Sequence, residues 1–176
     1  LGCLGDGGAI STNSAATGKR LLSRRDGGRR GGQIAYLPGI NSRLDEMQAC
    51  YLRAFLPKLG EWNAMRRRVA SLYEDGLRDC PGVRLLRTSE ESVRHLFVIR
   101  AARRGRLRDW LSSKGIGTGI HYPAPLHLMP AFGEAGLRRG DLPHAERAVR
   151  DILSLPVYPY LSDASVAEVI GRVREF

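Results

Sequence analysis

Cysteine is scarce in this chain, and its three copies follow no recognised spacing. Cys3, Cys50 and Cys80 are odd in number and none belongs to a CxxC motif, which argues against a disulfide framework and against a zinc knuckle. At 176 residues the chain is long enough to bury a core without disulfide bonds or a structural metal. We therefore expect reduced and mostly buried thiols.

Long apolar runs are also absent. No stretch approaches the roughly 20 apolar residues that a membrane-spanning helix needs. The first ten residues contain Asp6 and four glycines, so they do not form the core of a signal peptide. We expect no membrane partner and a cytoplasmic location. Contents of 43% apolar and 26% charged residues are typical of a folded globular protein.

Acidic residues are outnumbered, with 18 Asp and Glu against 28 Lys and Arg and a net charge of +10. Such an excess of positive charge makes nucleic acid a candidate partner. The basic residues are spread in small clusters over several predicted elements, with few aromatic residues between them for base stacking, which disfavours a nucleic-acid groove. A basic nucleic-acid-binding module stays an alternative, and salt-dependent DNA binding would support it.

The strongest periodic pattern lies between residues 44 and 73, where ten apolar side chains recur at steps of three and four residues. It predicts one long helix, or a helix pair that breaks near Pro57, because proline removes a backbone donor and clashes with the preceding turn. Before it we expect a short strand that ends near Ile10, a helix over Ala15–Arg25 and a glycine-rich loop.

Beyond Pro81 the predicted elements become shorter and mixed, which indicates a small α+β unit. Gly115 is expected to end one helix in a left-handed cap, and Asp141 and Ser162 are expected to cap the two helices that follow. The predicted elements are strands at 83–87, 93–100 and 117–122, and helices at 104–114, 141–152 and 162–176.

Four motifs occur in order along the chain: GDGGA at 5–9, NSRLDEMQA at 41–49, HYPAPLH at 121–127 and LSLP at 153–156. Together they resemble the DegT/DnrJ/StrS family of sugar aminotransferases over essentially the whole chain. The resemblance implies an α/β fold, the fold type I architecture of pyridoxal-phosphate enzymes. Residues 1–42 would end its large domain with a glycine-rich loop, 43–80 would form the connecting helix or helix pair, and 81–176 would form the small α+β domain.

The resemblance also implies a function. It predicts a homodimer, with active sites at the subunit interface, that uses pyridoxal 5′-phosphate to move an amino group from a donor to a nucleotide-linked keto sugar. The Schiff-base lysine would lie just upstream of Leu1, so no catalytic residue is assigned within the chain, and we expect the chain to be inactive alone. Lys19, Lys58 and Lys114 do not match the lysine's position. A sugar dehydratase of the same family, with histidine in place of that lysine, remains an alternative.

Cofactor-binding residues follow from the same resemblance. Asn41 would reach the cofactor phosphate of the partner subunit, and Gly5 and Asp6 would lie beside the cofactor, where glycine permits close backbone approach. From its residue type and place alone, Asn41 could equally be the N-cap of the helix that follows. Both roles stay open, because the entrance of a helix is also a site for anions.

Substrate-binding residues are implied in two segments. Arg43 would contact a phosphate or the nucleotide, although a salt bridge to Asp45 or Glu46 is an equal alternative. His121, Tyr122 and His127 would line the sugar-nucleotide pocket, and the proline after Tyr122 favours an extended backbone there. A lone histidine near an apolar strand end is also often a packed, hydrogen-bonded residue. No metal site is expected, since the two histidines have no third ligand at suitable spacing.

Overall fold

The computed structural model describes Gly2 and residues 4–176, so Cys3 lies outside the described residues. Their internal contacts divide the chain into two units, Leu1–Leu59 and Gly60–Phe176. This division falls between the boundaries at 42 and 80 that the resemblance implies for the domains of the whole enzyme, and those boundaries stay predictions. No helix among the described residues is long and apolar enough to cross a membrane.

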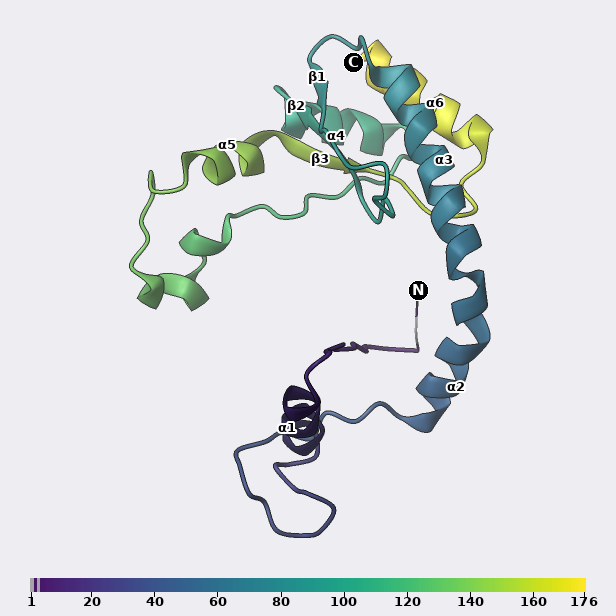
Figure 1. Ribbon diagram of the computed structural model, residues 1–176. Coiled ribbons are helices and arrows are strands. Elements are labelled where there is room, and N and C mark those ends of the chain that lie inside the picture. Colours follow the sequence, from purple (N-terminus) through teal and green to yellow (C-terminus); the bar gives the residue numbers. More distant parts are fainter. Residues whose placement is uncertain (1, 3) are drawn as a thin grey trace. The chain divides into compact units, whose positions relative to one another are not determined.

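Unit 1 is built around helix α1, Ala15–Arg25, as predicted (Figure 1). Ser14 caps it, with its hydroxyl oxygen accepting from the Thr17 N–H at 3.2 Å. The strand expected near Ile10 is wrong: residues 6–10 have no regular structure. The glycines on either side of Asp6 disfavour a strand, and the described part of unit 1 offers no strand to pair with.

The glycine-rich loop after α1 folds back onto the end of that helix. The N–H groups of Ile40 and Ser42 donate to the carbonyls of Arg24 and Arg25, each at 2.8 Å. Gly28 permits this return because it has a φ of 81° and because a Cβ there would lie 1.8 Å from the carbonyl oxygen of Leu37. The loop therefore places residues 40–42 beside the last turn of α1.

The predicted helix pair is confirmed. Helix α2 runs over Glu46–Phe55, a 3₁₀ turn, η1, covers Leu56–Lys58, and helix α3 covers Leu59–Leu77. Pro57 lies within the 3₁₀ turn, where its missing N–H and ring interrupt the α-helical hydrogen bonds.

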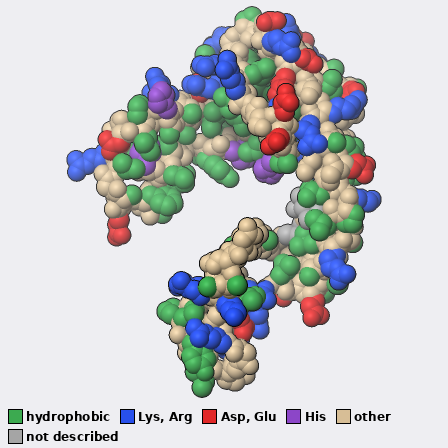
Figure 2. Space-filling view, in the orientation of Figure 1, with side chains coloured by type: hydrophobic (Ala, Val, Ile, Leu, Met, Phe, Trp, Pro, Cys, Tyr) green, Lys and Arg blue, Asp and Glu red, His purple; other side chains and the backbone are tan. Residues whose placement is uncertain are grey.

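Unit 1 leaves many apolar side chains exposed. Ile10, Ile40 and Met47 are 75%, 68% and 78% exposed, and apolar side chains are interspersed with basic ones over the face shown in Figure 2. The buried hydrophobic cluster of the described residues lies entirely in unit 2. Cys50 on α2 is exposed, against the expectation of mostly buried thiols, because unit 1 offers no core to cover it; Cys80 is buried, and both are free.

Unit 2 is a three-stranded antiparallel sheet with helices packed against it (Figure 1). The strand order is β1-β2-β3, and Ile99 of β2 pairs with both Leu85 of β1 and Leu153 of β3. The elements are β1 Val83–Leu85, β2 Phe97–Ala101, α4 Arg104–Ser113, the 3₁₀ turns η2 Leu126–Leu128 and η3 Pro130–Ala135, α5 Pro143–Asp151, β3 Ile152–Leu155 and α6 Asp163–Glu175.

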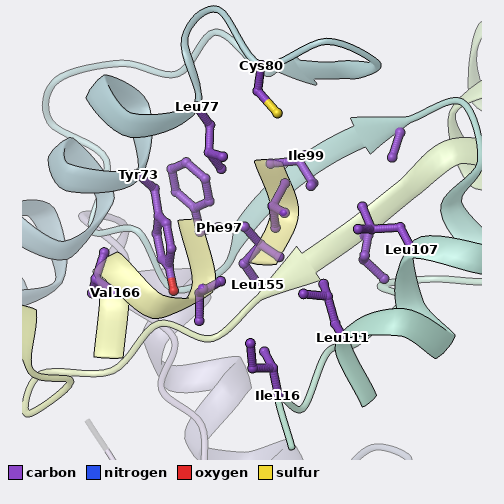
Figure 3. Packing of buried hydrophobic residues seen from close by; sticks show 14 of the residues in the cluster. Tyr73, Leu77, Cys80, Phe97, Ile99, Leu107, Leu111, Ile116, Leu155 and Val166 are labelled. Carbon is purple, nitrogen blue, oxygen red and sulfur yellow. The ribbon is translucent and has the colours of Figure 1, made fainter. Parts of the chain in front are cut away.

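The core of unit 2 lies between α3, the sheet, α4 and α6 (Figure 3). Tyr73 of α3 is fully buried, with its ring centroid 4.9 Å from that of Phe97 and its hydroxyl donating to the Pro156 carbonyl at 3.1 Å. Helices α3 and α6 approach closely at Gly76, where a Cβ would lie 2.6 Å from Cδ1 of Ile170. The core therefore fixes both the sheet and the loops that leave it.

Two predicted caps in unit 2 are confirmed. Gly115 has a φ of 76°, and the Ile116 N–H donates to the Leu111 carbonyl at 2.9 Å, the pattern of a Schellman cap. Ser162 caps α6, with its hydroxyl oxygen accepting from the Ser165 N–H at 3.1 Å. The strands expected at 83–87 and 93–100 are present but shorter.

Other predictions for unit 2 need correction. Asp141 does not cap α5, which has Leu142 at its N-cap; the Asp141 carboxylate instead accepts from the Arg138 N–H at 2.7 Å within the preceding turn. The segment 117–122 is reduced to one bridge between Gly119 and Ser154, because its glycines pack poorly and Pro123 ends the ladder. Ile152, expected at the end of a helix, begins strand β3.

Candidate functional site

A pocket of about 860 Å³ in unit 1 brings together three of the predicted site residues: Asp6, Asn41 and Arg43. Its walls are residues 6–10, one side of α1 and residues 40–48. Gly5 does not line it, but a Cβ on Gly5 would lie 3.9 Å from Nε2 of the pocket residue Gln48. The described residues that line this pocket include no lysine.

Asn41 is held at the pocket by its neighbours on both sides. It forms a bridge with Asp26, and its side-chain Oδ1 accepts from Arg43 Nε at 3.0 Å. The alternative role as N-cap is excluded, since α2 has Asp45 at that position. With Oδ1 engaged, the Nδ2 amide group has no partner among the described residues and remains a donor for a ligand.

The alternative for Arg43, an ion pair with Asp45 or Glu46, does not form in the structure. Arg43 instead has Nη1 3.6 Å from Oδ1 of Asp26, and its side chain is 57% exposed. The hydrogen bond from Arg29, assisted by the charge of Arg43, lowers the pKa of Asp26 below its ordinary value. Arg43 is thus oriented by an ionised carboxylate and keeps an exposed guanidinium.

The donors of this pocket suit an anion. Arg24, Arg25 and Arg43 line it together with the hydroxyl residue Thr12 and the Asn41 amide, against the carboxylates of Asp6 and Asp45. Guanidinium, hydroxyl and neutral amide groups are common ligands of phosphate oxygens. The arrangement therefore fits a phosphate group.

His121 and Tyr122 lie in unit 2, on the loop that follows the bridge at Gly119, and both side chains are exposed. Nδ1 of His121 lies 2.9 Å from Oγ of Ser154, and its ring packs edge-on to that of Tyr122 with centroids 5.6 Å apart. The alternative of a packed, hydrogen-bonded histidine is correct only in part. One ring nitrogen of His121 is hydrogen-bonded, but the side chain is exposed.

His127 has a different environment, because it is only 7% exposed. Its Nε2 lies 3.1 Å from Oε1 of Glu146, and the same oxygen accepts from the Gly140 N–H at 2.7 Å. These bonds, that of Gly140 first, lower the pKa of Glu146. His127 thus joins turn η2 to helix α5 inside unit 2, and its role toward a substrate stays a prediction.

Residues 1–174 match the DegT/DnrJ/EryC1/StrS aminotransferase family. The chain belongs to this family. It is 43% identical over 178 residues to the dTDP-3-amino-3,4,6-trideoxy-alpha-D-glucose transaminase of Streptomyces venezuelae, covering 100% of this chain and 47% of that protein. The transaminase of the same name from Micromonospora megalomicea subsp. nigra is 41% identical over 187 residues, which cover 99% of this chain and 49% of that protein.

The fold agrees with that of solved members of the family. The crystal structure of S. venezuelae DesV in complex with a ketimine intermediate matches with a TM-score of 0.94 and 44% identity, over 99% of this chain and 48% of that one. The chain therefore has the fold of the corresponding part of a fold type I pyridoxal-phosphate aminotransferase. It spans about half the length of the curated relatives that it matches.

Two further residues of this family member adjoin predicted site residues, one in each unit, and the sequence singled out neither. Gln48 lines the pocket of unit 1, and Ser154 bonds the ring of His121. Both lie within motifs that carry the resemblance, at 41–49 and 153–156. The motifs were thus the available signal, but motif membership alone does not say which side chains meet.

Proposed function

We propose that this chain supplies the C-terminal half of a pyridoxal-phosphate-dependent aminotransferase that acts on a nucleotide-linked keto sugar. Family membership supports the reaction class, and two relatives named as transaminases of a dTDP-linked amino sugar support the substrate class. The observation that carries the proposal is the pocket of unit 1, in which Asn41 presents amide donors that have no partner among the described residues, beside arginines.

The residues of this pocket fit the phosphate end of the cofactor. The Asn41 Nδ2 group donates to a phosphate oxygen, and the bond from Arg43 Nε to Oδ1 keeps the amide in the orientation that allows this. Pyridoxal phosphate, when bound, supplies the electron sink for amino transfer. In a homodimer with its sites at the subunit interface, Asn41 would serve the cofactor of the partner subunit.

The substrate-binding role falls to exposed polar groups. The Arg43 guanidinium, held by Asp26 but more than half exposed, suits a phosphate of the nucleotide. His121 and Tyr122 follow the bridge between Gly119 and Ser154 of β3. Each presents an exposed polar side chain that suits oxygens of the sugar. These groups bind and orient the keto sugar, while the acid and base steps belong to residues elsewhere in the whole enzyme.

A chimera tests this proposal. The segment of the S. venezuelae transaminase that aligns with this chain is replaced by it, and amino transfer to the keto form of the enzyme's named sugar is measured with glutamate as donor. We expect turnover. A chimera that folds and binds the cofactor but aminates no nucleotide sugar would refute the function.

The Asn41 role has its own control within the chimera. Asn41→Ala should weaken cofactor binding about tenfold, since it removes one hydrogen bond to a charged group. Asn13→Ala is the matched control: Asn13 is exposed and does not line the pocket, so cofactor affinity should stay unchanged. Equal affinities in the two variants would exclude Asn41 from phosphate binding.

A further inference from the structure

Ser154 is buried on strand β3, where hydrogen bonds hold both its backbone and its side chain. It is 3% exposed, and its backbone exchanges two hydrogen bonds with Gly119, at 2.8 and 3.0 Å. On the other side it pairs with Val98 of β2. The serine hydroxyl is therefore held by the sheet, and its only hydrogen-bond partner among the described residues is Nδ1 of His121, at 2.9 Å.

This single partner determines the direction of the hydrogen bond. A buried hydroxyl that donates to nothing loses the bond it would make with water, at a substantial free-energy cost. No other acceptor bonds Ser154 Oγ among the described residues, so the hydroxyl is satisfied as a donor only when it donates to Nδ1. In the neutral form of the ring, such a bond makes Nδ1 the unprotonated nitrogen and places the imidazole proton on Nε2.

Gly119 makes room for the ring in this position. A Cβ at residue 119 would lie 2.5 Å from Cε1 and 3.2 Å from Nδ1 of His121. Gly119 and Ser154 are bridge partners, so the space for the ring and the donor to it come from two adjacent backbones. By contrast, a Cβ at Gly117 would have no atom within 4 Å.

We propose that Ser154 and Gly119 are positioning residues that fix His121 in its Nε2–H tautomer, so that His121 presents a hydrogen-bond donor to an oxygen of the sugar nucleotide. The tautomer follows from the geometry of unit 2 alone; its use on a substrate rests on the proposed function. A donor selects an acceptor, such as a sugar hydroxyl or phosphate oxygen, and a freely exchanging ring would present donor and acceptor in turn.

The first test reads the tautomer in the 176-residue chain by nitrogen-15 NMR of the histidine rings at a pH where they are neutral. We expect His121 to show Nδ1 as unprotonated and Nε2 as protonated. In Ser154→Ala and Gly119→Ala both signals should move toward the averaged positions of a mixed population. A wild-type ring that already exchanges freely, or one protonated on Nδ1, would overturn the proposal.

Two matched controls separate positioning from mere stability. Leu153→Val disturbs the packing of β3 beside Ser154, so it should lower the thermal midpoint yet leave the tautomer of His121 unchanged. Gly117→Ala should leave it unchanged as well. If either control releases the ring as fully as Ser154→Ala does, the hydroxyl has no specific role.

The second test uses the active chimera. Ser154→Ala should raise the KM for the nucleotide sugar about tenfold, as expected for a weakened hydrogen bond to a charged or polar ligand. In a His121→Ala background it should have no further effect, because Ser154 acts through that ring. An equal effect in both backgrounds would refute the substrate role. A chimera without turnover would count against the proposed function, while the NMR result would still decide the positioning.

Discussion

His127 and Glu146 form a buried pair in which Nε2 of the ring lies 3.1 Å from Oε1 of the carboxylate. The carboxylate also accepts from the Gly140 N–H, so one oxygen joins turn η2, the loop before α5 and α5 itself. Such an arrangement compensates a buried charge with donors rather than with water. The loop that carries His121 is thereby held at its far end by a charge-dependent contact.

The stability of unit 2 should depend on pH through Glu146. Its pKa is lowered from the ordinary value of 4.5, mainly by the Gly140 N–H. The stabilisation is therefore complete above pH 4.5 and is lost as the pH falls through the lower folded-state pKa. Glu146→Gln should flatten the acid branch of a plot of thermal midpoint against pH, whereas Glu134→Gln, at an exposed side chain in η3, should not. Parallel acid branches in Glu146→Gln and wild type would contradict this.

Gly76 should be intolerant of a methyl group, unlike Gly60 in the same helix. A Cβ at Gly76 would lie 2.6 Å from Cδ1 and 2.9 Å from Cγ2 of Ile170, and we expect Gly76→Ala to cost about 1 to 3 kcal/mol of unfolding free energy. Gly60 has nothing within 4 Å, so Gly60→Ala should stabilise by up to about 1 kcal/mol through helix propensity. Urea unfolding measures both, and a stabilised Gly76→Ala would show that α3 and α6 separate easily.

The hydroxyl of Tyr73 should contribute through one hydrogen bond. Burial raises the pKa of this phenol, so it remains a donor to the Pro156 carbonyl at 3.1 Å throughout the accessible pH range. Tyr73→Phe keeps the ring contact with Phe97 and leaves the carbonyl without its donor, at a cost of about 1 kcal/mol. A denaturation midpoint equal to that of wild type would mean that water replaces the hydroxyl.

Features that depend only on residues close by in the chain could be predicted from the sequence. Pro57 breaks a helix by its own chemistry, and Gly115 and Ser162 end and begin helices through bonds within a few residues. Strand β3 was missed, because all four of its residues are buried and it therefore lacks the alternation that marks a half-buried strand. The Asp141 carboxylate could accept either from the start of α5 or from the preceding turn, and both choices are local. It accepts from the Arg138 N–H in that turn.

The predictions for the candidate site show the same difference between local signals and long-range contacts. Asp6, Asn41 and Arg43 came from the family resemblance, and the pocket of unit 1 shows that they share one space. The partner of His121 lies 33 residues away, and nothing in either segment specifies the pairing of Gly119 with Ser154. His127 was assigned to a substrate wall because its motif is shared, whereas its burial depends on Glu146, on a different element.

The two described thiols should differ in reactivity. Cys50 is exposed on α2, whereas Cys80 is buried and its pKa is raised by that burial, so its reactive thiolate is disfavoured. With iodoacetamide, native protein should be alkylated at Cys50 well before Cys80, and the difference should vanish in denaturant. Site-resolved mass spectrometry measures each thiol separately. Comparable native rates would indicate that unit 2 opens readily around Cys80.

The 176-residue chain by itself should not use pyridoxal phosphate for amino transfer. Its lysines are Lys19, Lys58 and Lys114, and none lines the pocket that contains Asn41. Lys114 lies instead over the ring of Trp110, with Nζ 4.3 Å from the centroid. An amine outside the pocket can react with the aldehyde, but it cannot orient the cofactor toward a substrate, and orientation supplies much of the rate enhancement. After incubation with the cofactor and reduction with borohydride, we expect substoichiometric label spread over the lysines, and no conversion of a nucleotide keto sugar with glutamate. Stoichiometric label on one of them, accompanied by turnover that the corresponding Lys→Arg variant abolishes, would make that lysine catalytic.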